Sequence, residues 1–229
     1  EPVSKMIGDK IPITIAMTVI AFVFILLLTV PVSLLSVRYE NRFIDHFFLI
    51  FNQITMSIPP FFIGIIFTVL FGLTFHFFTP GEYISYTESV SGFIGYLILP
   101  SLAIALPKAA MTIKMFRNSL ITEMHQDYVR TAFSRGNSPW RVLICHAFRN
   151  GILPVITFLG VAIADIIANS IVIEQVFGIP GMGRTLISSI SKRDYPVVEA
   201  IIVLIAVVIL VINMVTDLMY KVLDKRIEI

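Results

Sequence analysis

Charged residues and cysteine are scarce in this chain of 229 residues. Only 14% of its residues are charged and 57% are hydrophobic, and its mean hydropathy is +0.90. Soluble domains carry about 25% charged and roughly 45–50% apolar residues, so the composition excludes an ordinary soluble domain and predicts an integral membrane protein. The single cysteine, Cys145, excludes an internal disulfide framework. The formal net charge of +2 is too small to indicate a nucleic-acid partner.

Patterns that would indicate a metal centre, a nucleotide site or a protease are missing as well. The histidines lack the i,i+4 spacing of metal ligands, so we expect neither a metal nor a cofactor. The glycine-rich stretch Gly178–Arg184 lacks the Lys-Ser/Thr ending of a phosphate-binding loop, so this chain is not expected to bind ATP. An intramembrane serine protease needs a base beside its serine, and His76 is the sole weak candidate.

Five apolar stretches are each long enough to cross a membrane, for which about 20 residues suffice. We expect spans at about 11–37, 43–78, 92–113, 152–173 and 197–219, in an all-α polytopic domain that covers 11–226 after an extracytoplasmic lead at 1–10. The second stretch is broken by Pro59 and Pro60, which remove two backbone donors. Non-helical backbone at membrane depth is tolerated only against protein or a water-filled cavity. The break is therefore either a pathway element or a packed kink.

Lysine and arginine near the span ends predict the orientation. If the loop at 114–151 is cytoplasmic, that side holds 11 of these residues and the other side holds 5. The cytoplasmic group is Arg38, Arg42, Lys114, Arg117, Arg130, Arg135, Arg141, Arg149, Lys221, Lys225 and Arg226, and the outer group is Lys5, Lys10, Arg184, Lys192 and Arg193. The loop and the C-terminus are therefore expected inside and the N-terminus outside. Because the first residues lack a signal-peptide layout, we expect an upstream helix and six spans in the intact chain.

The stretch Asp127–Pro154 is the one long polar interruption of this apolar pattern. A turn signal at Gly136–Pro139 separates two segments in which apolar residues recur at helical spacing. The first segment carries a stripe of Tyr128, Ala132 and Phe133. Two short amphipathic helices joined by a sharp turn form a rigid protrusion, which is suited to docking in a partner's groove.

Several motifs follow one another in a fixed order. DYVRTA at 127–132 is followed by three residues and Gly136, and then by HAFRN at 146–150. Later the chain reads EQVFGIPGMGR at 174–184 and RDYP at 193–196. Three glycines and a proline within seven residues of the third motif predict a tight turn with positive-φ positions.

With these motifs the chain resembles the permeases of binding-protein-dependent ABC importers, and more narrowly their dipeptide, oligopeptide and nickel branch. The resemblance extends from Pro12 to about Arg226. The general family writes Glu-Ala-Ala where Arg130, Thr131 and Ala132 stand here. The narrower branch often replaces that glutamate, so the departure favours the narrower resemblance.

The resemblance implies a type I ABC transmembrane domain in a prokaryotic inner membrane. The chain would pair with a second homologous permease, two ATP-binding subunits and an external solute-binding protein, and it would not itself be an enzyme. Closing of the ATP-bound subunits would drive alternating access, through their different affinities for the two states. The solute would be a peptide, or nickel or a metal chelate, and the direction would be import.

The resemblance also implies two functional segments. The loop at 114–151 would dock to an ATPase subunit through Asp127, Tyr128, Arg130, Thr131, Ala132, Arg135 and Gly136. The loop at 174–196 would form an outer gate that contains Phe177, Pro180, Gly181, Gly183 and Arg184.

Charge inside the membrane is the remaining pointer to function. Asp165 and Asn169 lie one helical turn apart in the fourth span, and Lys108 lies late in the third. Asp165 would either line the pathway or pair with Lys108, or else make a hydrogen bond to the partner permease. An ion-coupled secondary transporter is the alternative function. That class predicts inverted internal repeats, and none is recognisable in the sequence.

Overall fold

A computed structural model of the chain describes residues 2–79 and 81–223, with side chains as far as Leu218. These residues form helices joined by turns, and none of them lies in a β-strand. In chain order the helices are α1 (Val3–Gly8), α2 (Ile11–Arg38), α3 (Phe43–Ser57), α4 (Pro60–Phe67), the π-helix η1 (Thr68–Thr74), α5 (Val90–Met124), α6 (Asp127–Ser134), α7 (Pro139–Val142), the π-helix η2 (Leu143–Ala147), α8 (Phe148–Gly151), α9 (Leu153–Phe177), α10 (Met182–Lys192) and α11 (Tyr195–Leu223).

Among the described residues, four helical stretches are long and apolar enough to cross a membrane. They are α1 with α2, then α5, α9 and α11, and a fifth span is present if the bent pair of α3 and α4–η1 is counted as one. The helix axis bends by 98° between the two halves of that pair. Pro59 stands before α4 with extended backbone and Pro60 is the first helical residue, a position where proline's missing N–H costs nothing.

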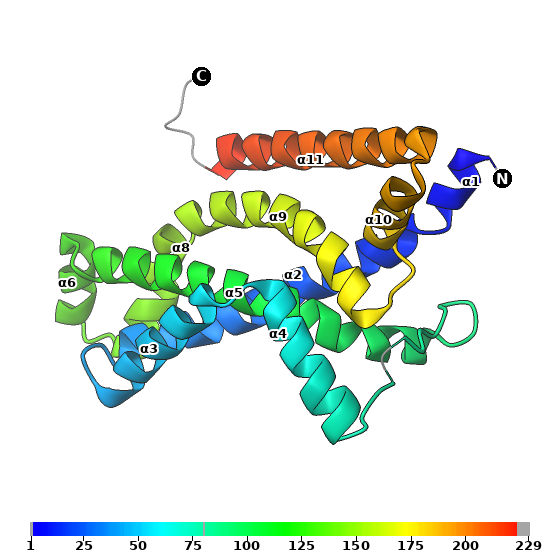
Figure 1. Cartoon of the computed structure of the whole chain (residues 1–229). Coiled ribbons are helices and arrows are strands. Elements are labelled where there is room, and N and C mark those ends of the chain that lie inside the picture. The colour runs from blue at the N-terminus through cyan, green and yellow to red at the C-terminus, as the bar shows by residue number, and fades with distance from the viewer. Residues whose placement is uncertain (1, 80, 224–229) are drawn as a thin grey trace.

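The helix α5 is the element around which the others are arranged, since it contacts α2, α3, α4 and α9 (Figure 1). Its buried face includes the small residues Ala103, Ala105 and Ala109, which allow neighbouring helices to approach closely in a membrane. By contrast α11 lies at the edge of the bundle beyond α9 (Figure 1), and only 11% of its apolar window is buried. The apolar surface that α11 leaves uncovered fits contact with lipid or with another subunit.

The helix that contains the third predicted span is longer than that span. α5 has 35 residues and continues to Met124, so the first part of the loop predicted at 114–151 is helical. A helix of that length measures about 52 Å, whereas the hydrocarbon core of a bilayer is about 30 Å thick. The predicted loop begins at Lys114, but α5 runs past this residue and past Arg117, which is paired with the buried Asp45.

The segments predicted to lie outside the membrane, 1–10 and 174–196, both contain helix. The lead at 1–10 contains α1, whose Ile7 is buried in a cluster with residues of α10 and α11. In the loop predicted at 174–196, α9 runs on to Phe177, α10 occupies most of the remainder and α11 begins at Tyr195. The predicted domain end at 226 lies outside the described residues.

Candidate functional site

The segment between α5 and α9 folds back on itself, and we call it the helical hairpin (residues 127–151). α6 forms the outgoing arm, and α7, η2 and α8 form the returning arm (Figure 1). Val129 and Ala132 of α6 pack with Val142 of α7, and each of the three is at most 4% exposed. The hairpin therefore has a small apolar core of its own.

The turn between the arms is built by four consecutive residues. Gly136 has φ +80°, a conformation that glycine adopts without steric cost. The side-chain amide of Asn137 donates to the Ala132 carbonyl at 2.9 Å, which satisfies an orphan acceptor at the end of α6. Ser138 caps α7, since its Oγ accepts from the backbone N–H of Arg141. The turn predicted at Gly136–Pro139 is thus present. A Cβ on Gly136 would meet nothing within 4 Å, so glycine is favoured there by the backbone conformation and not by lack of space.

Both arms of the hairpin are fixed to α5. In the returning arm, the rings of Phe148 and Phe116 meet edge to face at 5.4 Å, and Ser119 donates to the Gly151 carbonyl at 2.8 Å. In the outgoing arm, the Tyr128 hydroxyl reaches a carboxylate of α5. Movement of the hairpin is therefore tied to movement of α5.

The Tyr128 hydroxyl joins three segments. It donates to Glu123 Oε2 of α5 at 2.6 Å and accepts from Asn150 Nδ2 of α8 at 3.3 Å. Burial raises the pKa of the Tyr128 hydroxyl above its usual value, and the hydrogen bond to the Glu123 carboxylate raises it further. The hydroxyl therefore loses its proton, and its ability to donate to Glu123, at a higher pH than an ordinary tyrosine does.

The outward face of the hairpin combines apolar and cationic side chains. Phe133, Trp140 and Ile144 are large apolar residues that remain exposed, and they stand among exposed residues that the resemblance selected for docking. Those are Asp127, Arg130, Thr131, Arg135 and Gly136, with Asp127 and Arg130 joined by an exposed ion pair at 3.6 Å. Aromatic and arginine side chains are enriched where proteins bind one another.

The three residues of the predicted apolar stripe do not share one environment. Tyr128 and Phe133 are exposed, whereas Ala132 faces the core of the hairpin beside Val129. Ala132 consequently packs inside the hairpin, beneath the exposed residues proposed for docking, and is not itself available to a partner. Trp140 and Ile144 were not selected from the sequence, because an apolar residue at helical spacing does not reveal which face a partner covers.

A buried ion pair between α3 and α5, joined by a serine of α2, lies near the end of α5 that carries the hairpin. Asp45 of α3 is 1% exposed and accepts two hydrogen bonds from Arg117 of α5, at 2.7 Å from Nε and 2.6 Å from Nη2. Ser36 of α2 and the backbone N–H of Asn41 also donate to it. We call Ser36, Asp45 and Arg117 the inner clamp. Its charges are compensated within the protein, as buried charges must be.

At the other end of the molecule, Glu174 anchors α10. Its carboxylate is 0% exposed, accepts from Thr14 Oγ1 of α2 at 2.7 Å and accepts from the backbone N–H of Arg184 at 3.0 Å. Thr14 Oγ1 in turn accepts from the backbone N–H of Met182 at 3.1 Å. α10 has no capping side chain of its own, so residues of α2 and α9 satisfy the orphan donors at its N-terminus. Glu174 was not singled out from the sequence.

The glycines of this segment serve two different purposes. Gly178, with φ +71°, ends α9 in the left-handed region. Gly181 and Gly183 have negative φ, contrary to the prediction of several positive-φ positions. A Cβ on Gly181 would lie 2.3 Å from the Glu174 carboxyl carbon, and one on Gly183 would lie 2.3 Å from Ile171 Cα. Both positions are glycine because the chain passes too close to α9 for a side chain.

The other residues predicted for the outer gate lie around this anchor. Phe177 is buried, and its carbonyl accepts from the Tyr96 hydroxyl of α5 at 2.6 Å. Arg184 donates from Nη1 to the Gly178 carbonyl at 2.5 Å. Pro180 lies in the turn between α9 and α10. The outer segment is thus tied to both α5 and α2.

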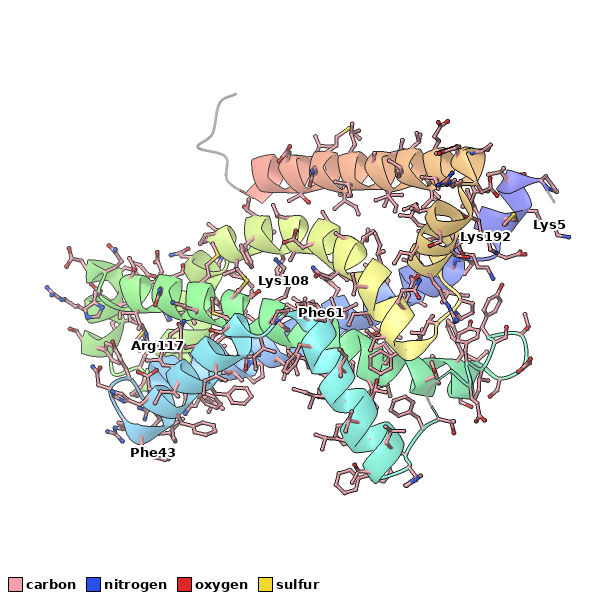
Figure 2. All side chains as sticks on the ribbon, in the orientation of Figure 1. Lys5, Phe43, Phe61, Lys108, Arg117 and Lys192 are labelled. Carbon is pink, nitrogen blue, oxygen red and sulfur yellow. The ribbon has the colours of Figure 1, made fainter. Side chains whose placement is uncertain are left out.

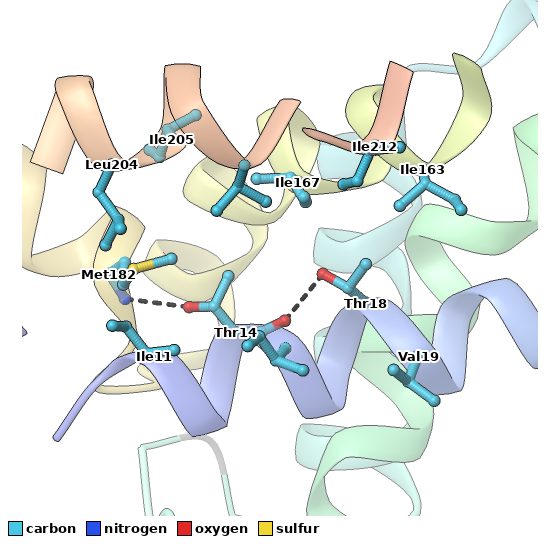
Figure 3. A pocket seen from close by; sticks show the side chains of 12 residues that line it. Ile11, Thr14, Thr18, Val19, Ile163, Ile167, Met182, Leu204, Ile205 and Ile212 are labelled. Atoms are coloured by element: carbon cyan, nitrogen blue, oxygen red, sulfur yellow. Dashed lines mark hydrogen bonds between the residues drawn. The ribbon is translucent and has the colours of Figure 1, made fainter. Parts of the chain in front are cut away.

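An apolar pocket of about 230 Å³ lies between α2, α9, α10 and α11 (Figure 3). Isoleucine, leucine and valine side chains form most of its lining. Its two threonine hydroxyls are already engaged, Thr18 with the Thr14 carbonyl and Thr14 with Met182 N–H (Figure 3). No charged side chain is among its lining residues, so this pocket is not suited to a charged solute.

The charged pair of the membrane-spanning region lies on α5 and α9 instead. Lys108 donates to Asp165, which is one of the arrangements considered from the sequence. Asn169, one turn further along α9, donates to the Asp165 carbonyl at 2.8 Å. The ion pair bridges α5 and α9, and α9 follows an arched course beside α5 (Figure 1).

Comparison with known proteins identifies the type of protein that this geometry belongs to. The chain matches the family described as "Binding-protein-dependent transport system inner membrane component" over residues 29–229. It is 33% identical over 229 residues to the oligopeptide transport system permease protein AppB of Bacillus subtilis, covering 99% of this chain and 72% of AppB. It is 30% identical over 229 residues to the dipeptide transport system permease protein DppB of the same organism, covering 100% of this chain and 72% of DppB.

Among solved structures, the fold is similar to inward-facing conformations of the MetNI methionine ABC transporter. Two of these structures superpose with TM-scores of 0.73 and 0.74 at 15% identity, covering 98% of this chain and 99% of the other. At that identity the likeness establishes the fold.

Proposed function

The chain belongs to the family of binding-protein-dependent transport system inner membrane components, and from this premise we propose that it forms half of the pathway of an ATP-driven importer for peptides. It is a multi-pass permease subunit of the inner membrane, as its relatives are. Those relatives are permease components, and the chemistry of ATP hydrolysis would belong to separate subunits.

The observation that carries the proposal is the helical hairpin. It is stiffened by its own core, fixed to α5 through Tyr128 and Phe148, and exposes Phe133, Trp140 and Ile144 beside arginines. A surface of this kind fits a groove on an ATP-binding subunit. Two such subunits would each receive one hairpin, from this chain and from a second, homologous permease.

Transport would proceed by alternating access. Closing of the ATP-bound subunits would shift the hairpin and, through Glu123 and Phe116, the inner end of α5. The shift would reach the outer segment because Tyr96 of α5 holds the Phe177 carbonyl. ATP favours one of the two states only to the extent that it binds that state more tightly. An external solute-binding protein would deliver the peptide to the outer opening.

Peptides are the proposed solutes because AppB and DppB are permeases of oligopeptide and dipeptide systems. Nickel or a metal chelate remains the alternative solute. Among the described residues, no three histidine, cysteine, aspartate or glutamate side chains are grouped to hold a metal ion.

Purification and reconstitution test this function. The full-length permease is purified from its native membrane, its partners are identified by mass spectrometry, and the complex is placed in proteoliposomes with the binding protein. We expect a stoichiometric ATPase partner and uptake of labelled peptide that requires both ATP and the binding protein. Uptake driven by an ion gradient without an ATPase would instead favour an ion-coupled secondary transporter, and uptake of nickel but not of peptide would move the proposal to the other solute class.

A further inference from the structure

The ion pair between Lys108 and Asp165 differs in kind from the inner clamp. In the inner clamp the carboxylate is almost completely buried and accepts several hydrogen bonds. The Asp165 side chain is 46% exposed and that of Lys108 is 16% exposed. Among the described residues, no side chain other than Lys108 donates to the Asp165 carboxylate. Asp165 Oδ1 thus has no hydrogen-bond partner there. The Lys108 ammonium donates to Asp165 alone, and it also lies over the Phe158 ring of α9, 5.9 Å from the ring centroid.

The charges of the pair argue against contact with lipid. Asp165 lies in a row of α9 residues at helical spacing, Val161, Asp165, Ala168 and Val172, whose other members are exposed and uncharged. A charge at membrane depth is costly in hydrocarbon, and such groups normally face the bundle interior or a water-filled cavity. The exposed row of α9 is therefore assigned to the side that faces the pathway.

The pair lies on two helices that both contact α4. Figure 2 shows Lys108 between the ribbons of α5 and α9, with the label of Phe61, at the start of α4, beside it in this view. α4 contacts both α5 and α9 and begins at the break after Pro59. Irregular backbone and an incompletely paired charge therefore lie on neighbouring elements, as expected beside an aqueous cavity.

The pair offers one anionic and one cationic group side by side, with no net charge. We propose that Asp165 and Lys108 bind the two charged ends of a peptide in transit, the α-ammonium at Asp165 and the α-carboxylate at Lys108. The inference rests on the proposed function and narrows its solute to a zwitterion with free termini. Without solute the two side chains neutralise each other. With solute one ion pair is exchanged for two, so neither protein charge is left unpaired at membrane depth.

The same chemistry disfavours a bare metal cation. The ammonium of Lys108, held beside the one carboxylate, repels a divalent ion that approaches Asp165. Asn169 already donates to the Asp165 carbonyl. A zwitterionic peptide meets no such penalty because each of its ends faces an opposite charge.

The test compares three labelled solutes in proteoliposomes that contain the complete complex: dialanine, its N-acetyl derivative and its C-terminal amide. Asp165→Asn and Lys108→Met variants are each compared with wild type for the same solute, so the selectivity of the binding protein cancels in the ratio. For Asp165→Asn we expect uptake of dialanine and of the amide to fall about tenfold, the size expected for losing a charge-assisted contact, with a much smaller fall for the N-acetyl derivative. Lys108→Met is expected to spare the amide and to reduce the other two.

Cysteine labelling covers the case in which the binding protein delivers no capped peptide. Ala168→Cys is introduced on the same face of α9 in a Cys145→Ser background, because the native cysteine is exposed. Modification by a charged thiosulfonate reports access to water, and millimolar dialanine is expected to slow it several-fold with Asp165 present but not in Asp165→Asn. An equal fall for all three solutes, no fall at all, or an unreactive thiol in the Ala168→Cys variant would overturn the proposal. A wild-type complex that imports no peptide with ATP would instead overturn the proposed function.

Discussion

At position 181 glycine is required by a neighbouring side chain and not by the backbone conformation. Its φ of −90° is open to any residue, yet a Cβ would lie 2.3 Å from the Glu174 carboxyl carbon. Glu174 cannot easily yield, because Thr14 and the N-terminus of α10 hold its carboxylate in a buried position. The absence of a side chain at Gly181 leaves the room that the Glu174 carboxylate occupies.

We expect Gly181→Ala to destabilise the purified complex by about 1–3 kcal/mol, the usual cost of overpacking a buried site. Thermal unfolding followed by circular dichroism measures the effect. The matched control is Gly95→Ala on α5, where a Cβ would meet nothing within 4 Å and where alanine is the better helix former. If both variants melted like wild type, the close packing of Glu174 on Gly181 would be refuted.

At the scale of elements, the outgoing arm of the hairpin depends on the Tyr128 hydroxyl. Tyr128→Phe removes the hydrogen bonds to Glu123 and Asn150, at a cost of about 1–3 kcal/mol because one partner is a carboxylate. We expect faster amide hydrogen exchange in α6 of the variant and unchanged exchange in α10. Equal exchange rates in α6 would show that the apolar core of the hairpin suffices alone.

The same tyrosine gives the arm a pH dependence of known sign. Because the pKa of the folded Tyr128 is raised, its stabilising contribution is complete below about pH 10, where an unfolded tyrosine is still protonated, and is lost as the pH rises through the higher folded value. Hydrogen exchange of α6 measured above pH 10, after correction for intrinsic rates, should accelerate in wild type. Tyr128→Phe should lack this additional acceleration.

The turn of the hairpin requires glycine because of its left-handed backbone. Gly136→Val should strain the turn by about 1–2 kcal/mol, reduce assembly with the ATPase subunits and weaken the dependence of ATP hydrolysis on peptide. Gly136→Asn is the control, since asparagine tolerates this conformation better than other non-glycine residues. Because a Cβ has open space within the chain, an equal loss in both variants would point to crowding by the docked partner and not to backbone strain.

The elements that the sequence predicts well are those set by local physics. About 20 uncharged residues suffice to indicate a span, and two consecutive prolines suffice to indicate the break that the structure places before α4. The continuation of α5 could not be predicted in this way. Whether Arg117 ends a helix or lies on its surface depends on Asp45, which lies 72 positions away in the sequence.

The candidate site shows the same limit. The pattern at 127–139 indicates the hairpin and its turn, because capping and turn residues act over a few positions. Burial of Ala132 and exposure of Trp140 depend on how the two arms pack against each other. The contact of Glu174 with Thr14 joins residues 160 positions apart, so a carboxylate at the end of an apolar span gave no local sign of its partner.

At the scale of the whole molecule, the inner clamp joins α2, α3 and α5 near the hairpin. Arg117→Met leaves the buried Asp45 carboxylate with only the Ser36 hydroxyl and a backbone N–H as donors, and we expect a loss of about 3–5 kcal/mol, as for other broken buried pairs. The double variant Arg117→Met with Asp45→Leu should recover much of that stability. Thermal unfolding of the complex measures both.

Arg130→Met supplies the comparison for the inner clamp, because Arg130 also pairs with an aspartate but both partners are solvent-exposed. Exposed ion pairs contribute little to stability, so this variant should melt close to wild type. A single Arg117→Met variant as stable as Arg130→Met would mean that Asp45 is solvated or protonated in the complex.

The inner clamp also has a mechanical consequence for α5. Arg117 lies seven residues from the end of this helix at Met124 and 27 residues from its other end at Val90, which correspond to lever arms of about 10 Å and 40 Å. If the clamp is the fulcrum on which α5 tilts as a straight rod, a displacement of the hairpin by one ångström moves the far end by roughly four. Pro100 and Pro107 lie in the long arm, and bending at these residues reduces that movement. A small displacement of the hairpin would then produce a larger displacement at the end of α5 near Val90.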